Sequence, residues 1–259
     1  MNEYVYPRLV LEGVDRYAQH QAWLHSQGFT FDRRVDLDDV EPVRLAMTRA
    51  DLRGADLHLA DLRAADLRNV KLNEAKLSGA NLRCARLSGA DLSCVDLRNA
   101  NLAGAGLRDA NLANANLANA NLANANLRGA HLDSADLHDA SMDATDLSAT
   151  DLSSSNLAGA NLADADLSAT DLRGANLFGA DLRGANLPCA DLPNANITGA
   201  NLIEANLIEA DLRDADLRDA DLRGANLFGA DLRGANLANA NLANANLANA
   251  KLTGANKEA

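Results

Sequence analysis

A five-residue unit repeats from residue 52 to residue 252 without a single insertion. The unit reads Ala-(Asp/Asn)-Leu-X-X, as in Ala180 to Gly184 or Ala115 to Asn119. Leu occupies 39 of the 41 central positions, and Met142 and Ile197 occupy the other two. A period of five matches neither the 3.6-residue period of a helix nor the two-residue alternation of a strand. The repeat itself must therefore determine the fold.

The spacing within the unit predicts a short extended step followed by a corner. In an extended segment Ala and Leu, two positions apart, point to one side, and the Asp or Asn between them points to the other. The next two residues are small or polar and suit a turn. Four such corners close a square coil of about twenty residues, and stacked coils would pair at roughly 4.8 Å. The repeat thus predicts an all-β, parallel solenoid of about ten coils and about 50 Å, filled by Leu and Ala.

The repeat resembles that of the pentapeptide-repeat family over about residues 45–256, and dozens of consecutive units match. The resemblance implies a right-handed quadrilateral parallel β-helix. It also implies that Leu and the preceding Ala point inward. The Asp or Asn and the two residues after Leu would then point outward, in agreement with the steric argument.

The first 34 residues differ in composition from the repeat. They contain the only Trp, Trp23, and all three Tyr of the chain. Asp15 is a suitable N-cap and Gly28 a suitable C-terminal stop for a short helix. We therefore expect a small α+β cap at 1–34, a repeat domain at 35–256 and a tail at 257–259. The cap would cover the open edge of the first coil, or it would be a separate recognition module. Residues 35–49 form an imperfect lead-in, in which Leu45 and Met47 take the inward places.

The charge is acidic and unevenly distributed. Lys and Arg number 24 and Asp and Glu 36, for a net charge of −12. Residues 129–172 contain no Lys or Arg. They contain nine acids: Asp133, Asp136, Asp139, Asp143, Asp146, Asp151, Asp164, Asp166 and Asp171. This band is either a solvated surface that keeps the rod soluble or a docking surface for a basic groove.

Residues twenty apart are expected to stack on one face. This arrangement predicts a row of five carboxylates, from Asp151 to Asp231, partly neutralised by Arg173, Arg213 and Arg233. A second face would stack Asn186, Asn206, Asn226 and Asn246. Stacked Asn side chains can form a hydrogen-bonded ladder.

Four outward apolar residues are candidate contacts: Phe178, Ile203, Ile208 and Phe228. Residues 171–187 recur as 221–237, an offset of 50 that equals two and a half coils. Phe178 and Phe228 should therefore face opposite ways, whereas Ile203 and Ile208 should lie on adjacent faces at one level.

The sequence predicts no catalytic residue, cofactor or metal site. His131 and His138 fall on different faces, and His58 lies four coils from His138, so these residues form no metal cluster. Every Gly after residue 50 except Gly106 belongs to a corner, and no phosphate-binding loop is present. The three cysteines, Cys84, Cys94 and Cys189, fall on outward positions, and their odd number without a CxxC motif favours a reducing compartment.

The resemblance implies two kinds of partner. Well-understood members of the family imitate DNA in shape and charge, and they bind type II topoisomerases such as DNA gyrase. They thereby confer antibiotic or toxin resistance. The alternative is a structural or adaptor rod whose specificity lies in residues 1–34. We expect a cytoplasmic protein that contacts neither membrane nor nucleic acid directly. An end-to-end homodimer through the C-terminal coil is also expected, because an uncovered coil edge can pair with another copy.

Overall fold

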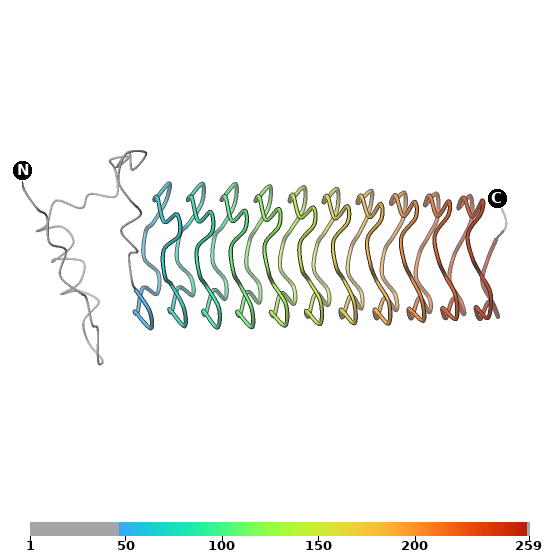
Figure 1. Ribbon diagram of the computed structural model, residues 1–259. Coiled ribbons are helices and arrows are strands. Elements are labelled where there is room, and N and C mark those ends of the chain that lie inside the picture. Colours follow the sequence, from blue (N-terminus) through green and yellow to red (C-terminus); the bar gives the residue numbers. More distant parts are fainter. Residues whose placement is uncertain (1–46, 258–259) are drawn as a thin grey trace, which may run out of the picture.

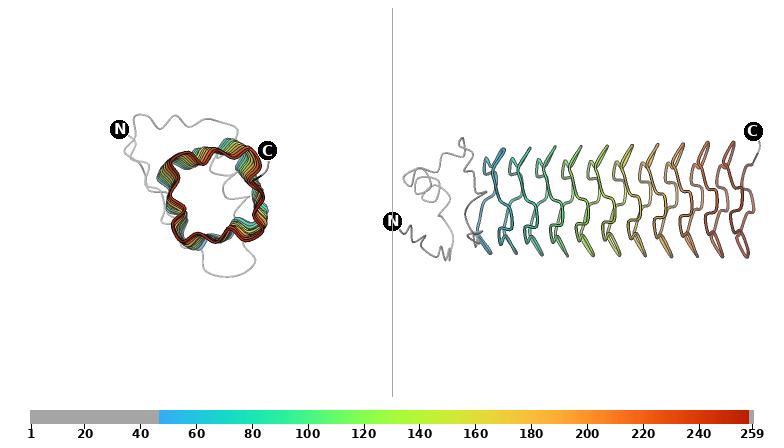
Figure 2. Two further views of the ribbon diagram at one scale, coloured as in Figure 1. Left: turned by 90° about the vertical axis from the view of Figure 1, so that its right-hand side faces the viewer. Right: turned by 45° about the horizontal axis from the view of Figure 1, so that its top comes forward.

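The computed structural model describes residues 47–257, which form a regular rod (Figure 1). Its β-structure consists of single bridging residues at every fifth position from Asp51 to Asn256. Each bridge is parallel and joins a residue to the one twenty positions later, from Asp51↔Lys71 to Asn236↔Asn256. One coil therefore contains twenty residues and four units. Seen along the axis, the coils superimpose into a nearly square outline (Figure 2).

The four sides of the square are named here by their bridging residues. Face 1 contains Asp51 and every twentieth residue after it, face 2 starts at Asp56, face 3 at Asp61 and face 4 at Asp66. The turn that follows each face takes the same number. These faces give each outward side chain a fixed position around and along the rod.

Each corner is a tight turn closed by a backbone hydrogen bond. In one unit the N–H of Ala185 donates to the carbonyl oxygen of Leu182, 3.1 Å away, across Arg183 and Gly184. Gly184 has a φ of +65°, whereas Arg183 does not have a positive φ. A positive φ at only the second central residue is the signature of a type II turn. The predicted alternation of step and corner is thus confirmed.

The second central residue of every turn from Arg49 to Gly254 has a positive φ. Fourteen of these residues are Gly and fourteen are Asn or Asp, the types that most easily adopt a left-handed conformation. The other fourteen, which include Ala144, Ala149 and Ala169, are strained by their Cβ. As the sequence predicts, Gly106 is the one glycine of the described rod outside a corner.

Two prolines fit the turn geometry directly. Pro188 and Pro193 occupy the first central position of their turns, where the fixed φ of proline suits a type II turn. The repeat thus accommodates both prolines without breaking the ladder of coils.

The core is a column of leucine with alanine beside each corner. Leucines from Leu67 to Leu232 are at most 1% exposed, and Met142 and Ile197 take their places without becoming exposed. Burial of each leucine contributes about 1.5–3 kcal/mol. Leu242 and Leu252, in the last described coil, are half-buried because only one side of that coil is covered by described residues.

Hydroxyl side chains that replace the inward alanine are hydrogen-bonded. Thr145 Oγ1 donates to the carbonyl oxygen of Leu122 at 2.9 Å, and Thr170 Oγ1 donates to that of Leu147 at 2.8 Å. Ser155 is bonded in the same manner within its own turn. The buried hydroxyls are therefore satisfied, which is the condition for placing a polar group in an apolar core.

Several predictions concern residues beyond the described range. The cap at 1–34, the lead-in to residue 46 with Leu45, and residues 258–259 lie outside it. The predicted coil number includes part of this region and stays a prediction. Met47 is described and packs, partly buried, against the core, as expected. Among the described residues no helix is long and apolar enough to cross a membrane.

Candidate functional site: an acidic girdle on the rod

The Asp or Asn of a unit caps the turn that follows it, except at Asn186 and Asp191, where the next turn begins with a proline that has no N–H. Asp151 Oδ1 accepts the backbone N–H of Ser153 at 3.0 Å, and Asn161 Oδ1 accepts that of Ala163 at 3.2 Å. Asp and Asn serve equally well because both offer this oxygen. Exchanging one for the other therefore changes the surface charge without changing the fold.

Asn side chains also connect successive coils. On face 4, Asn206 Nδ2 donates to Asn186 Oδ1 at 2.8 Å and Asn246 Nδ2 donates to Asn226 Oδ1 at 3.0 Å. These two contacts confirm steps at both ends of the predicted ladder. The ladder continues toward the N-terminus from Asn186 to Asp166, at 3.2 Å.

Face 2 contains a longer ladder that sequence reasoning missed. Asn156 Nδ2 donates to Asp136 Oδ1 at 3.0 Å, Asn176 donates to Asn156 at 3.0 Å, and Asn196 donates to Asn176 at 2.9 Å. The signal was present in the sequence as one Asp and three Asn spaced twenty apart. This ladder extends from the acidic residues 129–172 into the following coils.

The carboxylates of Asp-Leu-Arg sequences are paired within their own unit. In every described Asp-Leu-Arg sequence, the Arg binds the Asp two positions earlier; Arg183 Nε, for example, is 2.8 Å from Asp181 Oδ1. The predicted neutralisation by Arg173, Arg213 and Arg233 is confirmed. The ten acids involved are Asp51, Asp61, Asp66, Asp96, Asp171, Asp181, Asp211, Asp216, Asp221 and Asp231.

The strength of this pairing is evident in the pKa of Asp231. The hydrogen bond from the Arg233 side chain is the main cause that lowers this pKa from 3.8 to about 2, and Lys251 adds a smaller effect. The side chain of Asp231 is only 14% exposed, so water screens the pair incompletely. A paired Asp-Leu-Arg unit therefore presents little net charge to a partner.

The nine acids of residues 129–172 encircle the rod instead of lying along one face. We call this set the acidic girdle; it extends over about two coils, from Asp133 to Asp171. On side 1, counting each face together with its turn, lie Asp133, Asp151 and Asp171, and on side 2 lie Asp136 and Asp139. Side 3 has Asp143 and Asp164, and side 4 has Asp146 and Asp166. Each side of the square thus presents at least two carboxyl groups at this level.

Two girdle acids have a basic neighbour. Asp171 binds Arg173, and Asp136 Oδ1 lies 2.8 Å from His138 Nδ1. Burial alone would raise the pKa of Asp136, but the hydrogen bonds from His138 and Asn156 outweigh it and lower the pKa. The other seven acids have no Lys, Arg or His partner among residues 47–257. The girdle is therefore a ring of mostly uncompensated negative charge.

The four apolar candidates differ in exposure. Phe178 on turn 2 is 55% exposed and Phe228 on turn 4 is 38% exposed, so the two face opposite ways as predicted. Ile203 and Ile208, on the adjacent turns 3 and 4, are half-buried and so less exposed than the two phenylalanines. Sequence reasoning missed Leu59, which is 61% exposed because it occupies a turn position instead of the central position of its unit.

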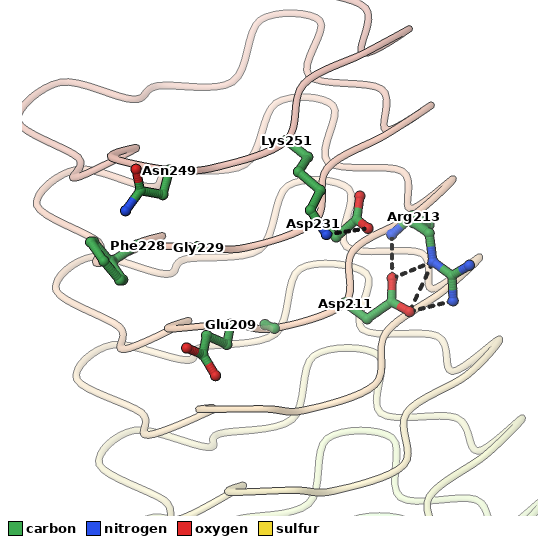
Figure 3. Close-up of a pocket in the computed structure, with 9 residues that line it drawn as sticks. Glu209, Asp211, Arg213, Phe228, Gly229, Asp231, Asn249 and Lys251 are labelled. Carbon is green, nitrogen blue, oxygen red and sulfur yellow. Dashed lines mark hydrogen bonds and ion pairs between the residues drawn. The ribbon is translucent and has the colours of Figure 1, made fainter.

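One shallow hollow of about 580 Å³ lies between turn 4 and face 1 near the C-terminal end. Figure 3 shows Glu209, Phe228 and Asn249 on one side of it, with ion-paired side chains on the other. There Arg213 binds Asp211, and Lys251 Nζ lies 3.7 Å from Asp231 Oδ2. The lining contains no His, Cys or Ser side chain.

The histidines of the rod are dispersed, as predicted. His58 Nδ1 is 2.8 Å from Ser78 Oγ. His58 and His138 lie on the same turn but four coils apart, and His131 lies on face 1. Between residues 47 and 257 no three His, Cys, Asp or Glu side chains come together as a metal site would require.

Comparison with known proteins supports the assignment of the fold. The family model described as pentapeptide repeats matches in eight copies that lie between residues 47 and 256. HetL, a pentapeptide repeat protein involved in heterocyst differentiation regulation in the cyanobacterium Nostoc sp. strain PCC 7120, is 41% identical. The match covers 75% of this chain and 88% of HetL, with a TM-score of 0.74. Proteins of this kind form right-handed quadrilateral β-helices, which agrees with the twenty-residue coil.

Two further structures match less closely. Rfr23 from the cyanobacterium Cyanothece 51142 is 38% identical over 36% of this chain and 64% of its own, with a TM-score of 0.35. QnrB1, a plasmid-mediated fluoroquinolone resistance protein, is 18% identical over 66% of this chain and 89% of its own, with a TM-score of 0.42. No curated protein sequence matches the chain.

Proposed function

Because the chain belongs to the pentapeptide-repeat family, we propose that it is a non-catalytic protein-binding rod. Its acidic girdle would dock in a basic groove that ordinarily holds DNA. The partner class we propose is a type II topoisomerase, with DNA gyrase first and topoisomerase IV second. Binding would modulate the enzyme or protect it from inhibitors such as quinolones, and it would take place in the cytoplasm.

The observation that carries this proposal is the lack of basic partners in the girdle. Seven of its nine carboxylates have no cationic neighbour among the described residues, whereas every Asp-Leu-Arg carboxylate elsewhere has one. An unpaired surface carboxylate is available to an incoming Lys or Arg at little cost, because no existing ion pair must be broken. Such a ring can therefore replace DNA phosphates in a basic groove.

The shape of the rod is consistent with this role. Its faces repeat without an inserted loop, so nothing in the described rod projects to keep a groove away from the girdle (Figure 1). Electrostatic attraction between a negative rod and a positive groove also accelerates encounter and weakens with salt. We therefore expect binding that falls steeply as ionic strength rises.

A gyrase supercoiling assay, run with and without a quinolone, tests the proposal. We expect the protein to inhibit supercoiling, or to protect it from the quinolone, at low micromolar concentration. Neutralising five girdle acids to Asn should weaken this effect about tenfold or more, since each lost contact reduces the electrostatic term. The five positions are Asp143, Asp146, Asp151, Asp164 and Asp166. Asn preserves the turn cap at the positions where the Asp supplies one, so the fold should persist.

A matched control neutralises five unpaired acids outside the girdle. These are Asp191, Glu204, Glu209, Asp214 and Asp219, changed to Asn or Gln. The net charge changes equally, but the girdle stays intact, so activity should remain close to that of the unmodified protein. Equal losses in both variants would show that only overall charge matters. No effect of the unmodified protein on either enzyme would rule out the topoisomerase proposal.

A second candidate function is that of a structural or adaptor rod. The observation in its favour is the 41% identity to HetL, whose structure is described as that of a regulator of differentiation. In this case residues 1–34 would carry the specificity and the rod would act as a spacer. Deletion of residues 1–34 distinguishes the two functions. The girdle proposal expects partner binding to survive the deletion, and the adaptor proposal expects it to disappear.

A further inference from the structure

The charge of the described rod is divided between its two halves. Residues 47–128 contain eleven Lys or Arg and eight Asp or Glu. Residues 129–257 contain eight Lys or Arg and nineteen Asp or Glu. Within residues 47–257, five arginines have no carboxylate partner: Arg49, Arg83, Arg86, Arg108 and Arg128. All five lie before the girdle, and the last four have a common location.

That location is face 4 with its two bordering turns. Arg86 is a bridging residue of face 4, Arg108 and Arg128 follow it on turn 4, and Arg83 is on turn 3. All four side chains are exposed. Arg108 and Arg128 are one coil apart, since the N–H of Asp109 donates to the carbonyl oxygen of Arg128. One side of the rod thus presents a cluster of unpaired guanidinium groups.

Gly106 leaves an opening in the middle of this cluster. It bridges Arg86 on one side and Asn126 on the other, and a Cβ added there would meet no atom within 4 Å. Arg86 and Gly106 have no side-chain oxygen and so cannot cap their turns. The N–H groups that such caps would bind, those of Ser88 and Arg108, have no hydrogen-bond partner among the described residues. The cluster therefore offers backbone donors as well as guanidinium groups to an anionic partner.

The same side of the rod carries girdle acids two coils further on. The bridging column of face 4 runs through Arg86, Gly106, Asn126, Asp146 and Asp166 in successive coils. Oδ1 of Asp146 and of Asp166 caps its own turn, whereas Oδ2 accepts no hydrogen bond from the described residues. Basic and acidic groups thus lie at equal distances on opposite sides of Asn126.

We propose that this surface binds a second copy of the chain, side by side and antiparallel. A two-fold axis at the level of Asn126 would place Arg86 of each copy opposite Asp166 of the other. It would likewise place Arg108 near Asp146, which would enter the opening above Gly106. Arg83 would approach Asp164, because an antiparallel two-fold brings turn 3 of one copy beside turn 3 of the other. A surface that is complementary to itself in this manner is the requirement for an isologous dimer.

The geometry of the rod favours such a contact. The coils superimpose closely along the axis, so the residues of face 4 in successive coils stay on one side of the rod (Figure 2). The acids on faces 1 and 2 would point away from the contact and remain accessible. The inference is therefore independent of the proposed function, and a dimer of this kind could still present girdle carboxylates to another protein.

The test combines sedimentation and small-angle X-ray scattering of the full chain at 50 and 500 mM NaCl. We expect a dimer at low salt whose maximum dimension stays close to that of one rod, and dissociation at high salt. A dimer about twice as long would indicate end-to-end pairing and overturn the proposal. A monomer at low salt would overturn it as well.

Two charge-reversed variants make the test specific. Arg86→Glu with Arg108→Glu gives an acidic surface, and Asp146→Arg with Asp166→Arg gives a basic one. Each variant alone should self-associate at least about 100-fold more weakly, since like charges would meet. An equimolar mixture should recover the dimer, because each reversed side chain then faces a group of opposite charge on the other variant. Failure of the mixture to associate, with both variants folded by circular dichroism, would contradict the arrangement.

The matched control reverses two acids at the same level on other faces. Asp136→Arg with Asp151→Arg removes two turn caps and changes the net charge as much as the basic variant does. This control should dimerise like the unmodified chain. Dissociation of the control would show that net charge or lost caps, and not face 4, control association.

Discussion

Asn176 donates a hydrogen bond from Nδ2 to Oδ1 of Asn156, 3.0 Å away and one coil earlier on face 2. Asn176 also accepts a hydrogen bond from Asn196 and caps the backbone N–H of Phe178. One amide thus connects three successive coils and closes a turn. These contacts tie the coils of a solenoid that is otherwise held by its apolar column and backbone ladder.

Replacing Asn176 should separate the ladder contribution from the cap contribution. We expect Asn176→Ala to lower the free energy of unfolding by about 2 kcal/mol, because it removes a cap and two side-chain hydrogen bonds. Asn161→Ala, which removes a cap on face 3, should cost about 1 kcal/mol. Urea unfolding followed by circular dichroism measures both. Equal costs would mean that the ladder adds no stability.

The left-handed corners predict an unusual stabilising mutation. Ala149 has a φ of +55°, which is unfavourable for a residue with a Cβ. Ala149→Gly should therefore raise the free energy of unfolding by about 0.5–1 kcal/mol, after allowance for the greater freedom of glycine in the unfolded chain. Ala163, the first central residue of its turn, does not have a positive φ, so Ala163→Gly should destabilise by about 0.5–1 kcal/mol. Thermal unfolding of the two variants gives opposite shifts if the corner conformation is correct.

The pairing of Asp231 with Arg233 predicts a defined response to acid. The folded pKa of Asp231 is about 2, below the ordinary 3.8, so the pair stabilises the folded state above about pH 4. This contribution is lost as the pH falls from about 4 to about 2, where Asp231 takes up a proton. Arg233→Met should raise the pKa of Asp231 toward 3.8, as measured by NMR titration of its carboxyl carbon. Lys251→Met, which removes a smaller effect, should raise it less.

The architecture of the rod could be predicted in detail because the five-residue period of the sequence is also the period at which side chains enter the core. A single spacing placed Leu182 and its equivalents inside and fixed the coil at twenty residues, and the bridges confirm this spacing. The strained corners were harder to foresee. Turn residues such as Ala149 and Leu59 adopt a conformation that their types disfavour, and only the surrounding repeat imposes it.

The distribution of charge could be predicted only in part. The sequence showed that residues 129–172 contain nine acids and no Lys or Arg, and assignment to faces then placed these acids around the rod. It revealed only some of the charges that cancel, since it predicted the pairs of Arg173, Arg213 and Arg233 but not the other Asp-Leu-Arg pairs. The Asp-Leu-Arg pairs, the ladder from Asp136 to Asn196 and the unpaired arginines on face 4 depend on side-chain conformations, which a repeat pattern does not specify.

A twenty-residue coil built from five-residue units has a consequence for changes in length. Inserting or deleting one unit would rotate everything after it by a quarter-turn, so residues that had shared a side would separate. A whole coil could be added without this loss of phase. The duplicated segments 171–187 and 221–237, offset by 50 residues, illustrate the effect by carrying Phe178 and Phe228 to opposite corners. A change of one unit between Asn126 and Asp146 would leave the core intact and separate the basic and acidic groups of face 4.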